Sequence, residues 1–202
     1  MLETSKITRR MEILLSLKEI SLTIEDALAK KAYSAAQFCS LSIPDLMGQF
    51  YYKKLGTTKR YIKWYDEHIH DYENPSLNLD NNDILMENIN QLNGSIVYAI
   101  RCKLFHEGKL LHPSVIKDLE KNYKQFIDTD KHKINLNISL ESSFTAYGYS
   151  TNNQNNIITI DVRINQKDMA ETLLRHANQL IDENTASTYP WKSFILPYSS
   201  RK

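Results

Sequence analysis

Two side chains of one predicted helix have the chemistry to act together on a phosphate group. Arg101 and His106 lie in the segment 95–108, SIVYAIRCKLFHEG, which is otherwise largely apolar. An arginine guanidinium binds anions through a planar fork of N–H donors, and an imidazole gains or loses a proton near neutral pH. On a helix, residues five positions apart lie about 140° apart around the axis and ~7.5 Å apart along it. We therefore expect the two side chains to flank one groove, with room for an anion between them.

The segment that carries this pair has the features of a short helix. Ser95 follows the turn signal Asn93–Gly94 and is a good N-cap, and Gly108 is a good residue to end the helix. Apolar residues recur between them at helical spacing and predict a buried stripe: Ile96, Val97, Ile100 and Leu104. Because a buried helix should not carry an unpaired guanidinium, we expect Arg101 to have a partner.

These residues form a pattern that resembles the signature of HEPN domains, in which a histidine follows an arginine after four to six residues. Here the pattern is Tyr-x-x-Arg-Cys-x-Leu-x-His-x-Gly, formed by Tyr98, Arg101, Cys102, Leu104, His106 and Gly108. The resemblance implies a small helical bundle, a homodimer and, as in many HEPN proteins, metal-independent cleavage of RNA in toxin–antitoxin or phage-defence systems. It gives Arg101 and His106 the catalytic roles and implies no cofactor and no metal. RNA or a nucleotide, and an antitoxin protein, are the partners that it suggests.

A second similarity is to a group of uncharacterised bacterial proteins, and it covers residues 43–108, about a third of the chain. It rests on Ile43-Pro44-Asp45, on Arg60-Tyr61-x-x-Trp64 and on the Tyr-x-x-Arg-Cys pattern. Around the central pair, we expect five residues to contact the substrate: Tyr98, Cys102, Lys103, Lys109 and His112.

Two alternatives to a ribonuclease stay open. In catalytic HEPN domains a polar residue usually follows the arginine, whereas this chain has Cys102, which favours a catalytically silent module that binds a nucleotide or a protein. The other alternative is a structural or regulatory helical dimer without a ligand. A phosphate between Arg101 and His106 of two subunits would favour the first two interpretations. A buried pair between Arg101 and a carboxylate would favour the third.

The composition limits the classes of function. The 202 residues include 25 Lys and Arg against 24 Asp and Glu, and the formal net charge of +1 provides no overall field that recruits nucleic acid. Cys39 and Cys102 form no CxxC pair, so we interpret both as reduced core thiols. No apolar run resembles a signal peptide or a membrane span, which predicts a cytoplasmic protein without a membrane contact.

The N-terminal half is predicted to be helical. Apolar residues in the segment 4–31 step by three or four positions, as expected of a helix in a bundle. The chain should continue as a helix through residues 32–39, and Ile43-Pro44-Asp45 should end it, because proline lacks the N–H that would continue the helix and pushes the residue before it out of the α conformation. The segment 51–65 interleaves lysines with aromatic residues, a composition that suits single-stranded RNA. The alternative is stronger, because Tyr61, Tyr65, His68 and Tyr72 share one helical stripe that is typical of a core.

The hydrophobic period changes near residue 131. Apolar residues alternate along 134–140 and again along 157–164, which predicts a β-hairpin, and a final helix should begin at Asn165 or Asp168. Residues 144–147 either extend the first strand or begin another. The expected fold is therefore mostly α: a HEPN-like helical bundle over residues 1–130, with a C-terminal β-hairpin, a final helix and a tail over 131–202 that pack on the bundle.

Overall fold

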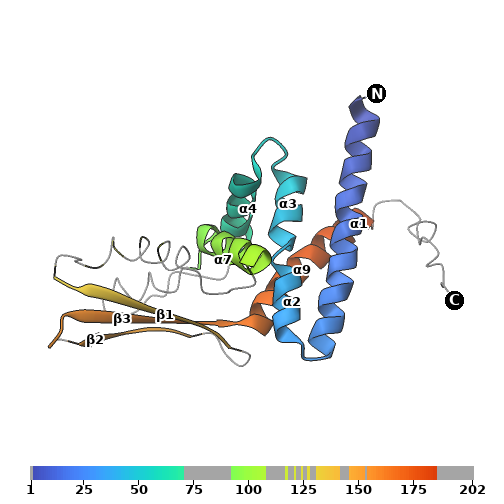
Figure 1. Ribbon diagram of the computed structural model, residues 1–202. Helices are drawn as coiled ribbons and strands as arrows, with labels where there is room; N and C mark the ends of the chain where they lie inside the picture. Colours follow the sequence, from blue (N-terminus) through green and yellow to red (C-terminus); the bar gives the residue numbers. More distant parts are fainter. Residues whose placement is uncertain are drawn as a thin grey trace.

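The computed structural model describes residues 2–70, 92–107, 131–141, 146–152 and 154–185, with residues 117, 121, 124 and 127. It is mostly helical and confirms the expected fold class (Figure 1). In chain order the elements are α1 (Leu2–Ala29), α2 (Tyr33–Ser40), α3 (Ile43–Tyr51), α4 (Thr57–Tyr65), the π-helix η1 (Asp66–His70), α7 (Gly94–Glu107), β1 (Lys133–Glu141), β2 (Ala146–Asn152), β3 (Ile157–Asn165) and α9 (Gln166–Thr185).

The helices α1, α2, α3 and α9 pack around one core, to which α4 and α7 add a further layer. From α1 the core takes the apolar stripe that the sequence predicts, including Leu17 and Ile24, which are fully buried. From α4 it takes Tyr61 and Trp64, which are also fully buried. The aromatic residues of α4 therefore belong to the core, as the stronger interpretation of this segment expected.

A proline separates two helices that the sequence did not distinguish. The first ends at Ser40, as predicted from the Ile43–Pro44 dipeptide, but a second helix, α3, begins immediately at Ile43. Pro44 lies in the first turn of α3, where a backbone N–H would have no partner within the helix. The same residue that ends α2 is therefore compatible with the start of α3, and this places Asp45 in its first turn.

The helix α7 begins at Gly94, earlier than the predicted N-cap Ser95 implies. Asn93, not Ser95, caps it: the Asn93 side-chain oxygen accepts a hydrogen bond from the Ile96 N–H at 3.2 Å. The Gly94 N–H donates to the Asp66 carboxylate at 2.6 Å, which ties the start of α7 to η1. Ile96 and other residues of the predicted stripe are buried. Gly108, the predicted end of the helix, lies outside the described residues.

The strands form a three-stranded sheet in the order β1-β3-β2, and this corrects the predicted hairpin. The first and the returning strand run parallel, with Lys133 paired to Ile157 and Glu141 to Asn165, whereas an antiparallel pair was expected. The hairpin is formed by β2 and β3, which pair antiparallel from Ala146–Arg163 to Asn152–Ile157. The two strands are neighbours, as predicted, but alternation of apolar residues does not determine whether paired strands run parallel or antiparallel.

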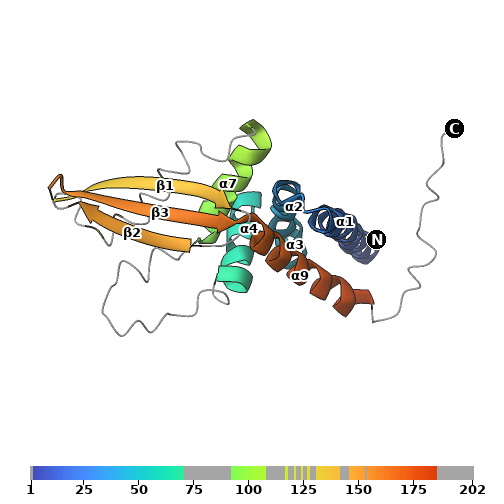
Figure 2. The ribbon, with the colours of Figure 1, turned by 90° about the horizontal axis from the view of Figure 1, so that it is seen from below.

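The sheet projects to one side of the helices, and β3 leads directly into α9, which runs back along the bundle (Figures 1 and 2). Asn165 caps α9, since its side-chain oxygen accepts hydrogen bonds from the N–H groups of Lys167 and Asp168, so the helix begins at the first of the two predicted positions, Asn165 and not Asp168. The buried Gln166 side chain donates to Gln37 of α2 at 3.1 Å. The sheet is thus joined to the bundle by a continuous chain segment, and the first residue of α9 makes a buried polar contact with α2. The division of the chain at residue 130 stays a prediction.

Candidate functional site

Arg101 lies near the middle of α7, and its guanidinium faces the start of α3. Its Nη2 is 3.7 Å from a carboxylate oxygen of Asp45, and the two side chains are 20% and 21% exposed. This is an ion pair, but its distance exceeds that of a hydrogen bond. The partner that the sequence required for Arg101 is therefore Asp45, and the pair is largely, not fully, removed from water.

The Asp45 carboxylate is shared between two arginines. Its other oxygen accepts a hydrogen bond at 3.0 Å from Nη2 of Arg60 on α4, so Asp45 is closer to Arg60 than to Arg101. Arginine stays charged in proteins, and two guanidiniums against one carboxylate leave one positive charge in this cluster. The Nε groups of both arginines are buried and have no hydrogen-bond partner in the described part of the chain. The Arg60–Asp45–Arg101 cluster therefore carries a surplus positive charge, and its two buried Nε groups lack a hydrogen-bond partner in the described residues.

Arg101 also contacts one ring of an aromatic pair. The Cζ atom of Arg101 is 5.0 Å from the centre of the Phe105 ring, a distance typical of a cation–π contact. The Phe105 ring in turn stacks on Phe38 of α2, with ring centres 4.2 Å apart and planes 11° apart. These contacts limit the positions available to the guanidinium, which is thus held between a carboxylate and an aromatic ring.

His106 is exposed in the last turn of α7. No hydrogen bond or ion pair joins it to Arg101 within the described residues. We expected the two side chains to flank one groove, but no direct contact between them in the described residues supports such a groove. What the structure provides is one fixed, largely buried cation and, five residues further along, one imidazole that is open to solvent.

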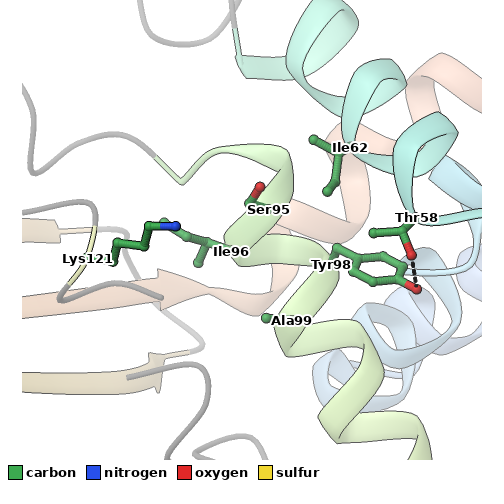
Figure 3. Close-up of a pocket in the computed structure, with 7 residues that line it drawn as sticks. All are labelled: Thr58, Ile62, Ser95, Ile96, Tyr98, Ala99 and Lys121. Atoms are coloured by element: carbon green, nitrogen blue, oxygen red, sulfur yellow. Dashed lines mark hydrogen bonds between the residues drawn. The ribbon is translucent and has the colours of Figure 1, made fainter. Parts of the chain in front are cut away.

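A pocket of about 300 Å³ lies beside the first turns of α7, and Figure 3 shows its lining. Tyr98, one of the predicted substrate contacts, lies in its wall, and its hydroxyl accepts a hydrogen bond at 2.9 Å from Thr58 of α4. The other lining residues are Ile62, Ser95, Ile96, Ala99 and Lys121. Neither Arg101 nor His106 lines this pocket, so it contains Tyr98 but not the predicted catalytic pair.

The other predicted substrate contacts are only partly placed. Cys102 and Lys103 are half-buried on α7, whereas Lys109 and His112 lie outside the described residues. The sequence reasoning missed Asp45, Arg60 and Phe38 as members of the site. The first two stand in the segments that carry the similarity to uncharacterised bacterial proteins, and that similarity was the available signal. Phe38 carried no signal beyond its apolar character.

Tyr61 is a fully buried core residue that contacts Tyr98, one of the predicted substrate contacts. Its hydroxyl donates a hydrogen bond at 3.1 Å to the backbone carbonyl of Leu41, and burial raises the pKa of this phenol well above its ordinary value. The Tyr61 ring contacts the Tyr98 ring edge-on, with centres 5.1 Å apart. Tyr61 therefore stays a neutral hydrogen-bond donor at physiological pH and acts as a structural support.

In the described part of the chain, no three His, Cys, Asp or Glu side chains are grouped so that they could hold a metal ion. Cys39 and Cys102 are both free thiols. None of the helices in the described ranges is long and apolar enough to cross a membrane.

Comparison of the chain with models of protein families, with curated proteins and with solved structures found no match.

Proposed function

We propose that this chain is a metal-independent endoribonuclease of the HEPN type. The observation that supports the proposal is the surplus positive charge of the Arg60–Asp45–Arg101 cluster, whose Arg101 lies on the same helix as the exposed imidazole of His106. A fixed guanidinium suits the phosphate of an RNA chain, and an exposed imidazole suits proton transfer near neutral pH. The Arg–His spacing that resembles the HEPN signature adds to this support.

In the proposed reaction the 2′-hydroxyl of one ribose attacks the adjacent phosphorus. A bond forms between phosphorus and O2′, and the bond to O5′ of the next nucleotide breaks. The products are a 2′,3′-cyclic phosphate and a 5′-hydroxyl end, so the proton lost by O2′ is balanced by the proton gained by O5′. His106 exchanges a proton with one of these oxygens, and Arg101 stabilises the negative charge that develops on the phosphate.

The proposal includes a homodimer in the cytoplasm, with an antitoxin protein as a possible regulator in a toxin or phage-defence system. One Arg and one His form a small active site, whereas a two-fold axis through this face would supply two of each. The exposed position of His106, away from Arg101 in its own chain, agrees with a cleft that is completed by a second subunit.

A second candidate is favoured by the ion pair between Arg101 and Asp45. If this pair serves only to join α3 to α7, the chain is a structural or regulatory helical dimer without a ligand, which is the interpretation that a buried pair between Arg101 and a carboxylate favours. The catalytically silent module that binds a nucleotide or a protein is the further alternative. The distance of 3.7 Å and the preference of Asp45 for Arg60 favour the first candidate, because they leave Arg101 incompletely satisfied.

The deciding experiment is incubation of the purified chain with mixed RNA in EDTA, followed by analysis of the RNA ends. The ribonuclease proposal expects cleavage that EDTA does not inhibit and products with 2′,3′-cyclic phosphate and 5′-hydroxyl ends. The His106→Ala variant, purified in parallel, controls for a contaminating nuclease. Intact RNA, or cleavage that the variant retains in full, would support the silent alternative.

A further inference from the structure

The ring of Phe38 is an exposed aromatic surface beside the Arg101 site. Phe38 is 39% exposed, although its ring stacks on Phe105 with centres 4.2 Å apart. A single exposed phenylalanine is common on protein surfaces, so exposure alone does not indicate a ligand. What distinguishes Phe38 is the group that its stacking partner contacts, the guanidinium of Arg101.

The chemistry next to this surface is positive. The Arg101 guanidinium lies over Phe105, the ring on which Phe38 stacks, and it belongs to the cluster in which two arginines share one carboxylate. His106 directly follows Phe105 in the chain. A flat apolar surface, a guanidinium and an imidazole thus lie within a short part of α7 and its neighbour α2.

We propose that Phe38 is a stacking platform for an unpaired RNA base, whose adjacent phosphate is bound by Arg101. The inference rests on the proposed function and names its substrate class as single-stranded RNA. Proteins that hold single strands combine aromatic side chains, on which bases stack, with basic groups that bind the backbone. The surplus positive charge of the cluster favours this polyanion over an apolar protein surface as the occupant of the patch.

The test measures the affinity of the chain for a fluorescent 12-nucleotide single strand of 2′-O-methyl RNA, which cannot be cleaved because its 2′-oxygen is blocked. Phe38→Leu keeps an apolar side chain but removes the ring. We expect its Kd for the RNA strand to rise by about 10-fold, which is the usual effect of losing the stack of one base on an aromatic side chain. Phe38→Tyr keeps the ring and should bind within about 2-fold of the wild type. Tyr51→Leu removes another exposed aromatic ring, at the end of α3, and is the matched control.

Several results would overturn the proposal. Unchanged affinity of Phe38→Leu excludes stacking, and an equal loss in Phe38→Leu and Phe38→Tyr excludes a role of the ring as such. Dissociation of a dimer by Phe38→Leu, with RNA affinity unchanged, identifies a second copy of the chain as the occupant. If the wild type cleaves mixed RNA while Phe38→Leu keeps full affinity, only this inference fails. If the wild type neither binds nor cleaves RNA, the proposed function fails with it.

Discussion

The carboxylate of Asp45 lies 3.7 Å from the guanidinium of Arg101, although the two residues come from helices far apart in the chain. The same carboxylate accepts a hydrogen bond from Arg60, so one acidic group connects α3, α4 and α7. Whatever the function, this contact holds α7, the helix that carries Arg101 and His106, against α3. The strength of the contact is therefore the first quantity to measure.

Removal of the Asp45 charge should destabilise the fold. In Asp45→Asn the two largely buried guanidiniums face each other without a counter-charge, and we expect the free energy of unfolding to fall by about 2 kcal/mol or more. Urea denaturation monitored by circular dichroism measures the loss. The control is Asp26→Asn, which removes an exposed i,i+4 pair with Lys30 and should change the free energy by less than about 1 kcal/mol. Equal losses in the two variants would show that Asp45 has no special role.

A second prediction concerns the contact between α7 and α4. A Cβ atom at Gly94 would lie 2.6 Å from the carbonyl oxygen of Ile62 and 2.9 Å from its Cα, so Gly94→Ala requires backbone movement. We expect a loss of about 2 kcal/mol, as is usual for overpacking. At Gly56, a Cβ atom would meet nothing within 4 Å. Gly56→Ala should therefore stay within about 1 kcal/mol of the wild type in the same denaturation experiment. A loss at Gly56 as large as at Gly94 would contradict this packing.

The third prediction is a pH effect at the start of η1. The hydroxyl of Tyr52 donates a short hydrogen bond to Glu67, and this bond, with help from Lys63, holds the pKa of the Glu67 carboxyl below its ordinary value of 4.5. A lowered pKa in the folded state stabilises the fold above about pH 4.5, and this contribution disappears as the pH falls through the folded-state pKa. Tyr52→Phe should move the pKa of Glu67 upward toward 4.5.

The pKa of Glu67 can be followed by the carbon chemical shift of its side-chain carboxyl during an NMR titration. Tyr51→Phe, which removes a neighbouring hydroxyl, should leave the titration of Glu67 in place. At the alkaline end, burial and the bond to Glu67 raise the pKa of Tyr52 above 10.0. Its contribution to stability is thus complete below pH 10 and is lost only as the pH rises beyond that value.

The sequence predicts the helical elements well because their apolar periodicity is local. The stripe of α1 and a start of α9 at Asn165 or Asp168 follow from neighbouring residues; the stripe is confirmed, and of the two starts the structure has the first. The parallel direction of β1 and β3 did not follow, since parallel and antiparallel partners present the same alternation. The start of α3 was missed because Pro44 was considered only as the end of a helix.

For the candidate site, the need for a partner of Arg101 was predictable, but the identity of the partner was not. Several carboxylates were available in the sequence, and only the packing of α3 against α4, and of α4 against α7, selects Asp45. The stack of Phe38 on Phe105 depends in the same way on two helices from distant parts of the chain. Contacts of this kind are set by tertiary structure and have no local pattern.

The last prediction separates catalysis from architecture by comparing stability with activity. His106 is exposed, so His106→Ala should change the free energy of unfolding by less than about 1 kcal/mol. If His106 transfers a proton in RNA cleavage, the same variant should lose activity by ~10²-fold or more. Arg101→Ala should also lose cleavage, and Arg101→Lys should restore little of it, because an ammonium group cannot reproduce the planar fork of donors.

Thermal melts of the wild type and of the Arg101→Ala and His106→Ala variants, run beside the cleavage assay, decide between the two candidates. In the structural alternative, Arg101→Ala removes one of two cations from Asp45 and lowers the melting temperature. Neither the wild type nor any variant then cleaves RNA. Because Arg60 still pairs with Asp45 at 3.0 Å, the ribonuclease proposal expects only a moderate loss of stability in Arg101→Ala, with a much larger loss of cleavage. Wild-type RNA cleavage that survives both substitutions would end the assignment of catalysis to this pair.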